Sequence, residues 1–198
     1  LVFPVMRGLA PLATACFAVF ALHEHLTALQ MAGLAVASFA IILFALPTGT
    51  TASTRRLDRD ALIWAVLTAL GVGLYAVADT RAARAMPNPM TFVVWLFLLD
   101  WIGVTVVACM QRRGRIRAAI AKQWKGGLAG GILGTFSYAL AIYAYTLTDA
   151  AIVTALRETS VVFAAALGAI FLKEGFGYRR ICAAALLAAG LLSMQVGA

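Results

Sequence analysis

Several apolar runs of about 20 residues constrain this chain more than any other feature, because that is the length a helix needs to cross the hydrocarbon core of a bilayer. Only 12% of the residues are charged, whereas a soluble domain carries about 25%. So few charges could not cover the surface of a soluble protein. We therefore predict an all-α fold, a polytopic membrane helix bundle.

The breaks between the apolar runs are polar or contain Pro and Gly, and they divide the chain into about seven transmembrane helices. The expected helices span residues 1–22, 28–46, 61–80, 89–110, 126–147, 150–172 and 178–197.

The basic residues fall on alternate loops. Twelve Lys and Arg residues lie in 47–60, 111–125 and 173–180, whereas 81–88 holds two. Because loop Lys and Arg accumulate on the cytoplasmic side, the first three loops are expected there and the C-terminus outside. The net charge of +8 is thus interpreted as an orientation signal that meets anionic lipid, and no nucleic-acid partner is expected.

No motif for a metal, a cofactor or a catalytic centre is found. Cys16, Cys109 and Cys182 are scattered through apolar runs without a CxxC pair, so we expect neither a disulfide framework nor a metal site. P-loop, GxSxG, HExxH and dinucleotide-binding patterns are missing from the sequence. No cofactor, no enzyme activity and no ATP-driven transport are therefore predicted.

The beginning of the chain resembles a later segment. Arg7 and Glu24 recur 150 residues later as Arg157 and Glu174, each time within a helix rich in small residues that ends near the Glu. Because the helix at 150–172 comes five helices after the one at 1–22, an odd number, the two copies are expected to run in opposite directions. An inverted repeat of this kind is the construction of many secondary transporters.

Two stretches resemble the EamA family of the drug/metabolite transporter superfamily. One is the run from Leu156 to Leu192, with Leu172-Lys173-Glu174 at the turn and Gly190 in the final helix. The other is LYAVADTRAARAMPNPMTFVVWLF, with Tyr75, Asp79 and Arg84. The resemblance implies a partial ten-helix fold made of two five-helix halves.

On that family plan the chain divides into three parts. Residues 1–47 would be the last two helices of a first half, 48–60 a cytoplasmic linker, and 61–198 the complete second half. The start LVFPVMRG, which lacks an initiator Met, fits a fragment without about three N-terminal helices. The family plan puts both ends in the cytoplasm, which differs from the outward C-terminus expected from the loop charges.

Arg157 and Glu158 are adjacent charges about seven residues into a predicted helix, or roughly 10 Å from its start at 1.5 Å per residue. Ionisable groups at such depth usually face a bundle interior, a partner or a water-filled path. Neighbours on a helix point in different directions, so the two do not simply pair with each other. They are candidate substrate contacts, with Glu158 also a candidate proton site; a structural ion pair or snorkelling is the alternative.

Asp100 lies near the middle of the expected helix 89–110. Apolar surroundings disfavour the charged form of a carboxylate unless a cation lies near, and Arg157 is the obvious candidate. We expect Asp100 to face the interior and to contact substrate or couple transport to protons, with a hydrogen-bonded packing residue as the alternative.

Aromatic and acidic residues on other helices complete the candidate set. Tyr75 and Tyr138 are expected to contact substrate, whereas Asp79 and Arg84 are interpreted as a structural helix end. Tyr145, like Tyr143, is expected in the aromatic belt at the membrane interface.

Two further features are interpreted as structural. Gly126, Gly130 and Gly134 recur every fourth residue, a spacing typical of close helix packing. Glu24 lies between two histidines, but a carboxylate before a helix start favours an interaction with the exposed N–H groups there rather than a metal.

The sequence thus predicts a secondary transporter that exports a small metabolite, such as an amino acid or a drug-like compound, by alternating access. The expected location is the plasma membrane, which is the inner membrane in bacteria. The expected partners are a small-molecule substrate and the lipid bilayer, and a homodimer is one option. The first alternative is a truncated membrane fragment that does not transport. The second is an integral membrane enzyme.

Overall fold

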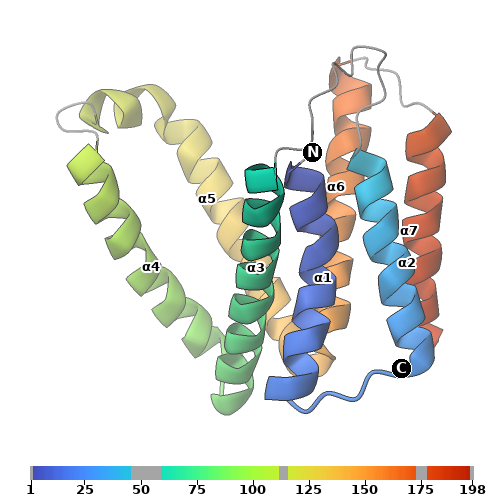
Figure 1. Ribbon diagram of the computed structural model, residues 1–198. Helices are drawn as coiled ribbons and strands as arrows, with labels where there is room; N and C mark the ends of the chain where they lie inside the picture. Colours follow the sequence, from blue (N-terminus) through green and yellow to red (C-terminus); the bar gives the residue numbers. More distant parts are fainter. Residues whose placement is uncertain (1, 46–58, 112–115, 173–177, 197–198) are drawn as a thin grey trace. The chain divides into compact units, whose positions relative to one another are not determined.

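The computed structural model describes residues 2–45, 59–111, 116–172 and 178–196, and these are almost entirely helical (Figure 1). The helices are α1 (Val2–Ala21), α2 (Ala28–Ala45), α3 (Arg59–Ala85), α4 (Pro89–Gln111), α5 (Ile116–Leu147), α6 (Ala150–Leu172) and α7 (Tyr178–Val196). The all-helical prediction is confirmed for the described residues, and most helix ends agree within one or two residues.

Two helices are longer than expected. α3 continues to Ala85 and α5 begins at Ile116, ten residues before the predicted start at residue 126. Both extensions are rich in Ala, Arg, Lys and Gln, which have high helix propensity. The prediction was wrong at these ends because it treated charge as a sign of a loop.

Local hydrogen bonds explain where two of the helices begin. The N–H of Gln30 donates to the Thr27 hydroxyl at 3.2 Å, and the Gln30 side-chain oxygen accepts from the Thr27 N–H at 2.7 Å. This reciprocal capping box starts α2. The side-chain oxygen of Asn88 accepts from the N–H of Met90 at 2.9 Å, with Pro89 at the first position of α4, where its missing N–H costs nothing.

The described chain divides into two compact units. The first comprises residues 1–79 and 148–198, and the second comprises residues 80–147. α3 contributes to both, because the boundary falls at Asp79.

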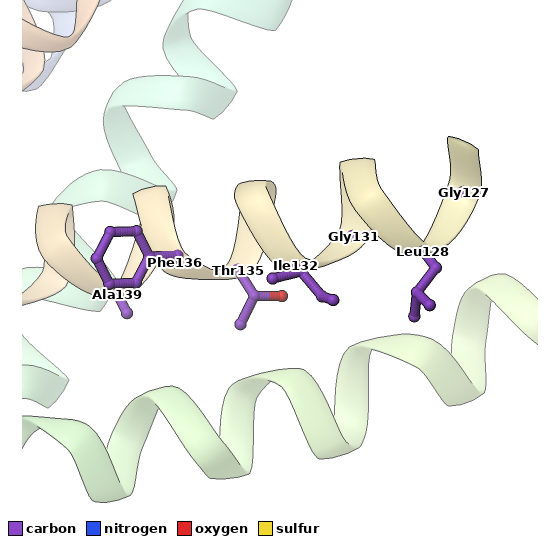
Figure 2. Close-up of a pocket in the computed structure, with 7 residues that line it drawn as sticks. All are labelled: Gly127, Leu128, Gly131, Ile132, Thr135, Phe136 and Ala139. Carbon is purple, nitrogen blue, oxygen red and sulfur yellow. The ribbon is translucent and has the colours of Figure 1, made fainter. Parts of the chain in front are cut away.

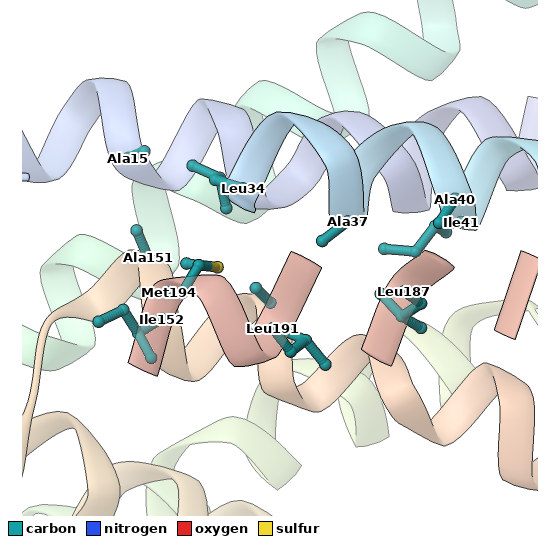
Figure 3. Close-up of a cluster of buried hydrophobic side chains, with 11 residues drawn as sticks. Ala15, Leu34, Ala37, Ala40, Ile41, Ala151, Ile152, Leu187, Leu191 and Met194 are labelled. Atoms are coloured by element: carbon teal, nitrogen blue, oxygen red, sulfur yellow. The ribbon is translucent and has the colours of Figure 1, made fainter. Parts of the chain in front are cut away.

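The first unit has a core of small and branched apolar side chains. Its α1 and α2 face α6 and α7, and the side chains point toward one another in the interior (Figure 3). The cluster consists of Ala15, Leu34, Ala37, Ala40, Ile41, Ala151, Ile152, Ala155, Leu187, Leu191 and Met194. Alanine at so many of these positions lets the helices approach closely.

Gly33 of α2 and Gly190 of α7 mark the closest approach in that unit. A Cβ atom built on Gly33 would lie 2.6 Å from the Gly190 carbonyl oxygen, and one on Gly190 would lie 2.8 Å from the Gly33 carbonyl oxygen. Real Cβ atoms do not come so near a backbone oxygen, so both positions require glycine. The early part of α2 is therefore packed against the late part of α7, and the two run antiparallel.

The second unit is built from α4, α5 and the end of α3. The ring of Phe97 on α4 meets Tyr138 on α5 edge to face, with centroids 5.9 Å apart. The Arg84 side chain donates from Nε to the Tyr145 carbonyl at 2.9 Å, which satisfies a carbonyl near the end of α5. Arg84 thus has the structural role that the sequence predicted.

Tyr145 itself is fully buried, so the expectation of an exposed belt residue was wrong there, whereas Tyr143 is exposed. Periodicity near a helix end cannot by itself distinguish a side chain that faces lipid from one that faces the protein.

Among the residues that the structure describes, three stretches are long and apolar enough to cross a membrane: Arg59–Ala85, Pro89–Met110 and Gln123–Leu147. The described parts of α1, α2 and α7 are apolar but shorter, at Val5–Ala21, Ala28–Leu43 and Ile181–Val196. These lengths agree with a helical membrane bundle.

Candidate functional site

Glu158 on α6 forms an ion pair with Arg7 on α1, inside the first unit. The Arg7 Nη1 atom lies 3.2 Å from one carboxylate oxygen and 3.1 Å from the other. The Glu158 side chain is only 7% exposed and that of Arg7 is 35% exposed. A buried carboxylate without a nearby cation would be costly, so the Arg7 guanidinium stabilises the charged form of Glu158. The two residues are 151 positions apart in the sequence, and their contact links α1 to α6.

Arg7 was not predicted as a partner of Glu158. It was matched only with Arg157, as the equivalent position of the repeat. A signal was present, since each of the two helices carries an Arg at the same place and only the second carries a Glu beside it.

Arg157 and Asp100 lie in different units. Arg157 is half-buried on α6 of the first unit, next to the paired Glu158, and Asp100 is exposed on α4 of the second unit. Interior placement of Asp100 is therefore not seen within the second unit. The proposed pairing of Asp100 with Arg157 stays a prediction.

Glu24 provides a second polar link between α1 and α6. Its carboxylate oxygens accept from the Ala150 N–H at 3.2 and 3.0 Å, and the residue is 7% exposed. The chain leaves α1 through His23, whose φ of 54° is in the left-handed region that often ends a helix. The end of α1 is thus beside the beginning of α6, and these helices run antiparallel (Figure 1).

The expectation that Glu24 interacts with exposed N–H groups is correct, but the helix differs. The carboxylate caps α6 rather than the next helix, α2, whose start already has the Thr27–Gln30 box. A cap across the fold depends on tertiary structure and has no local signal.

A groove of about 540 Å³ runs along α5 in the second unit. Figure 2 shows its lining side chains on the side of α5 toward α4. The lining residues are Gly127, Leu128, Gly131, Ile132, Thr135, Phe136 and Ala139. The groove is almost wholly apolar, and the Thr135 hydroxyl is its one polar side-chain group.

The glycines of α5 make no close contact within the described part of the chain. Nothing lies within 4 Å of a Cβ atom built on Gly126, Gly130 or Gly134, and the same holds for Gly127 and Gly131. Their predicted packing role is not seen inside this unit. The space above Gly127 and Gly131 is instead part of the groove.

The two candidate tyrosines differ in their surroundings. Tyr138 follows Gly131 by two helical turns, so it lies on the groove side of α5, and it is half-buried against Phe97. Tyr75 on α3 is 42% exposed, and it belongs to the first unit.

A comparison with protein families gives a match that covers most of this chain. The model of a family described as EamA-like transporters matches residues 60–195, which run from the beginning of α3 almost to the end of α7. A search of curated proteins finds no match, and neither does a search of solved structures.

Proposed function

The chain belongs to the EamA-like transporter family, and from that premise we propose that it is a secondary transporter that exports a small metabolite by alternating access. The substrate would be an amino acid or a drug-like compound. The membrane would be the plasma membrane, with all seven helices crossing it.

The antiparallel helix pairs support an inverted repeat. α1 runs against α6 and α2 against α7, and the first member of each pair lies 150 residues before its counterpart in the repeat. Transporters with such repeats keep their substrate site near the bilayer midplane, where the repeats meet. We propose that α1–α2 and α6–α7 are these two copies.

The buried pair of Arg7 and Glu158 is the observation that carries the proposal. Both charges lie in apolar helices, one in each proposed copy of the repeat. Charged groups in such helices are costly, and in membrane proteins they commonly mark substrate or ion pathways.

Substrate contacts are proposed for Arg157, Asp100, Tyr75 and Tyr138, together with Glu158. The α5 groove would hold an apolar part of the substrate, since its lining offers many carbon atoms and one hydroxyl. Proton coupling would depend on Asp100 or Glu158, because a carboxylate in a membrane protein can exchange a proton during the transport cycle.

The extent of the family match supports the proposed division of the chain into a partial first half and a complete second half. The family match begins at residue 60 and ends at residue 195, close to the proposed second half at 61–198. Residues 1–47, which hold α1 and α2, would then be the last two helices of a first half.

A resistance screen is the first experiment. Cells that overexpress the chain are challenged with toxic amino-acid analogues and drug-like compounds, and compounds to which they become resistant are tested for transport by purified protein in vesicles. We expect saturable transport of at least one such compound. Absence of transport for every compound, with folded protein in the vesicles, would contradict the proposal.

Asp100→Asn then tests proton coupling. If Asp100 carries the proton, the variant transports with a flattened dependence on pH, because Asn cannot titrate. An unchanged rate and pH profile would remove Asp100 from the mechanism.

A further inference from the structure

The cation is the accessible member of the Arg7–Glu158 pair. The Glu158 side chain is 7% exposed, whereas that of Arg7 is 35% exposed. A molecule that approaches the pair therefore meets the guanidinium first. A guanidinium presents its N–H donors in one plane, and this arrangement matches the two oxygens of a carboxylate.

The charges around Glu158 disfavour a cationic ligand. Arg157 precedes Glu158 on α6 and Arg7 contacts it from α1, so two arginines are close to one carboxylate. The other helices packed against α6 in this unit are α2 and α7. α2 has no ionisable residue, and α7 has its ionisable residues within 178–182, soon after the end of α6, whereas Glu158 is in the first half of α6.

The contact between α1 and α2 brings a buried hydroxyl close to the residue that follows Arg7. A Cβ atom built on Gly8 would lie 2.9 Å from the Ser38 carbonyl oxygen, so the two helices approach closely there. Ser38 is 2% exposed, and its hydroxyl has no hydrogen-bond partner among the described residues. Buried hydroxyls normally have a partner, so the Ser38 hydroxyl suits an oxygen of a ligand.

We propose that the substrate binds through a carboxylate, which takes the place of the Glu158 carboxylate at the Arg7 guanidinium. The Ser38 hydroxyl donates to the second oxygen of the substrate carboxylate. The substrate is then an amino acid and not a cationic drug-like compound. This assignment rests on the proposed transport function and names the substrate class of that site.

The exchange takes up a proton. Once the ligand carboxylate pairs with Arg7, Glu158 is buried without that cation, and a buried unpaired carboxylate is costly. Glu158 therefore binds one proton from water and forms an O–H bond, while the ligand carboxylate stays ionised. One negative charge arrives as another is neutralised, so the net charge at the pair is unchanged. Carboxylate binding and proton binding thus favour each other.

The first measurement is the thermal stabilisation of the purified protein in detergent by each common L-amino acid and by the matching amino-acid amide. An amide keeps the side chain and the amine and lacks the carboxylate. We expect at least one amino acid to stabilise the protein, and its amide to have no effect at the same concentration. Equal stabilisation by acids and amides, or no stabilisation by any amino acid, would overturn the proposal.

Calorimetric titration of the amino acid that stabilises most then tests the exchange. The wild-type affinity should rise by up to about tenfold for each unit by which the pH falls, since one proton binds with each ligand. Glu158→Gln imitates the protonated side chain, so it should bind more tightly than the wild type and without dependence on pH. Weaker binding in Glu158→Gln would mean that Glu158 contacts the ligand amine, and unchanged binding would mean a purely structural pair; both contradict the exchange.

Two further variants test the carboxylate contacts. R7Q/E158Q leaves neither charge alone, so it should fold and bind no amino acid; wild-type affinity in this variant would overturn the proposal. Ser38→Ala should unfold at the wild-type temperature and bind about fivefold more weakly, the loss of one hydrogen bond. Its control is Ser193→Ala, because the Ser193 hydroxyl already donates to the Gly190 carbonyl at 2.7 Å. Equal affinities of the two serine variants would remove Ser38 from the site.

Binding and transport can fail separately. Amino-acid binding with this pattern but without transport in vesicles would contradict the transporter and support the carboxylate exchange. Transport of cationic compounds that lack a carboxylate would support the transporter and overturn the exchange.

Discussion

The two units use glycine in opposite ways. In the first unit, Gly33 and Gly190 lie where two helices approach so closely that a single added carbon would overlap backbone atoms. In the second unit, the glycines of α5 face open space, although their four-residue spacing is the better match to a packing motif. Spacing alone therefore does not tell whether a glycine serves close packing.

The two units also differ in how far their carboxylates are buried. Glu158 and Glu24 of the first unit are buried and bonded, whereas Asp100 of the second is exposed. The two buried carboxylates have partners within their own unit, as buried polar groups require. We thus expect substitutions in the first unit to affect stability and those in the second to affect chiefly function.

Arg7→Ala is expected to have the largest effect on stability. It leaves the Glu158 carboxylate buried without its partner, which costs about 3 kcal/mol of unfolding free energy, at the low end for buried pairs because Arg7 is partly exposed. Thermal unfolding in detergent measures the loss. Adding Glu158→Gln should recover part of it.

The matched control is Asp100→Asn in the second unit, which should change the unfolding free energy by no more than about 0.5 kcal/mol. Equal losses in the two variants would remove the difference between the units.

Gly33→Ala should have the next largest effect on stability, a loss of about 1–3 kcal/mol of unfolding free energy. The new methyl group would meet the Gly190 carbonyl oxygen, and α2 and α7 would have to move apart. Gly130→Ala adds the same atom in open space and is the comparison. The same unfolding measurement applies, and a Gly33 variant as stable as the wild type would show that the approach is looser than described.

Glu24→Ala should cost about 1 kcal/mol, because the Ala150 N–H loses its acceptor at the start of α6. Asn88→Ala removes an exposed and purely local cap from α4, and it should cost less. Hydrogen exchange of the first turn of α6 would report the loss directly. Equal protection in wild type and Glu24→Ala would mean that the cap contributes little.

Gly131→Ala should have the smallest effect on stability, a gain of up to about 1 kcal/mol from helix propensity. The methyl group narrows the α5 groove without touching protein atoms, so transport of a compound found in the screen should fall. Gly130→Ala has the same propensity gain but lies outside the groove lining. If the two variants transport equally well, the groove does not hold substrate.

The helices themselves were predictable from the sequence. Apolar runs bounded by Pro, Gly and charge predicted nearly correctly the helices that the described residues form, because each run must satisfy its own backbone in an apolar medium. The family could also be identified from Leu172-Lys173-Glu174 and Gly190, and the match to residues 60–195 agrees. The early start of α5 was missed, since charged residues with high helix propensity look like a loop.

The candidate site was predictable only in part. Arg157, Glu158 and Asp100 stood out because a charge in an apolar helix is conspicuous. The partner of Glu158 could not be chosen in the same way, because Arg7 and Arg157 are equivalent in the repeat and only helix packing distinguishes them. The groove of α5 had no signal apart from the glycines, which pointed to packing.

By itself, the order of residues determined where the helices of the described residues lie, apart from the extended ends of α3 and α5, and that they are apolar enough for a membrane, since these depend on propensity and on the cost of exposing apolar groups. Only the tertiary structure decided that Glu158 meets Arg7, that Glu24 caps α6 and that Gly33 rather than Gly130 is at a close approach. Such contacts join positions more than a hundred residues apart, and they depend on how helices pack, which no local pattern encodes.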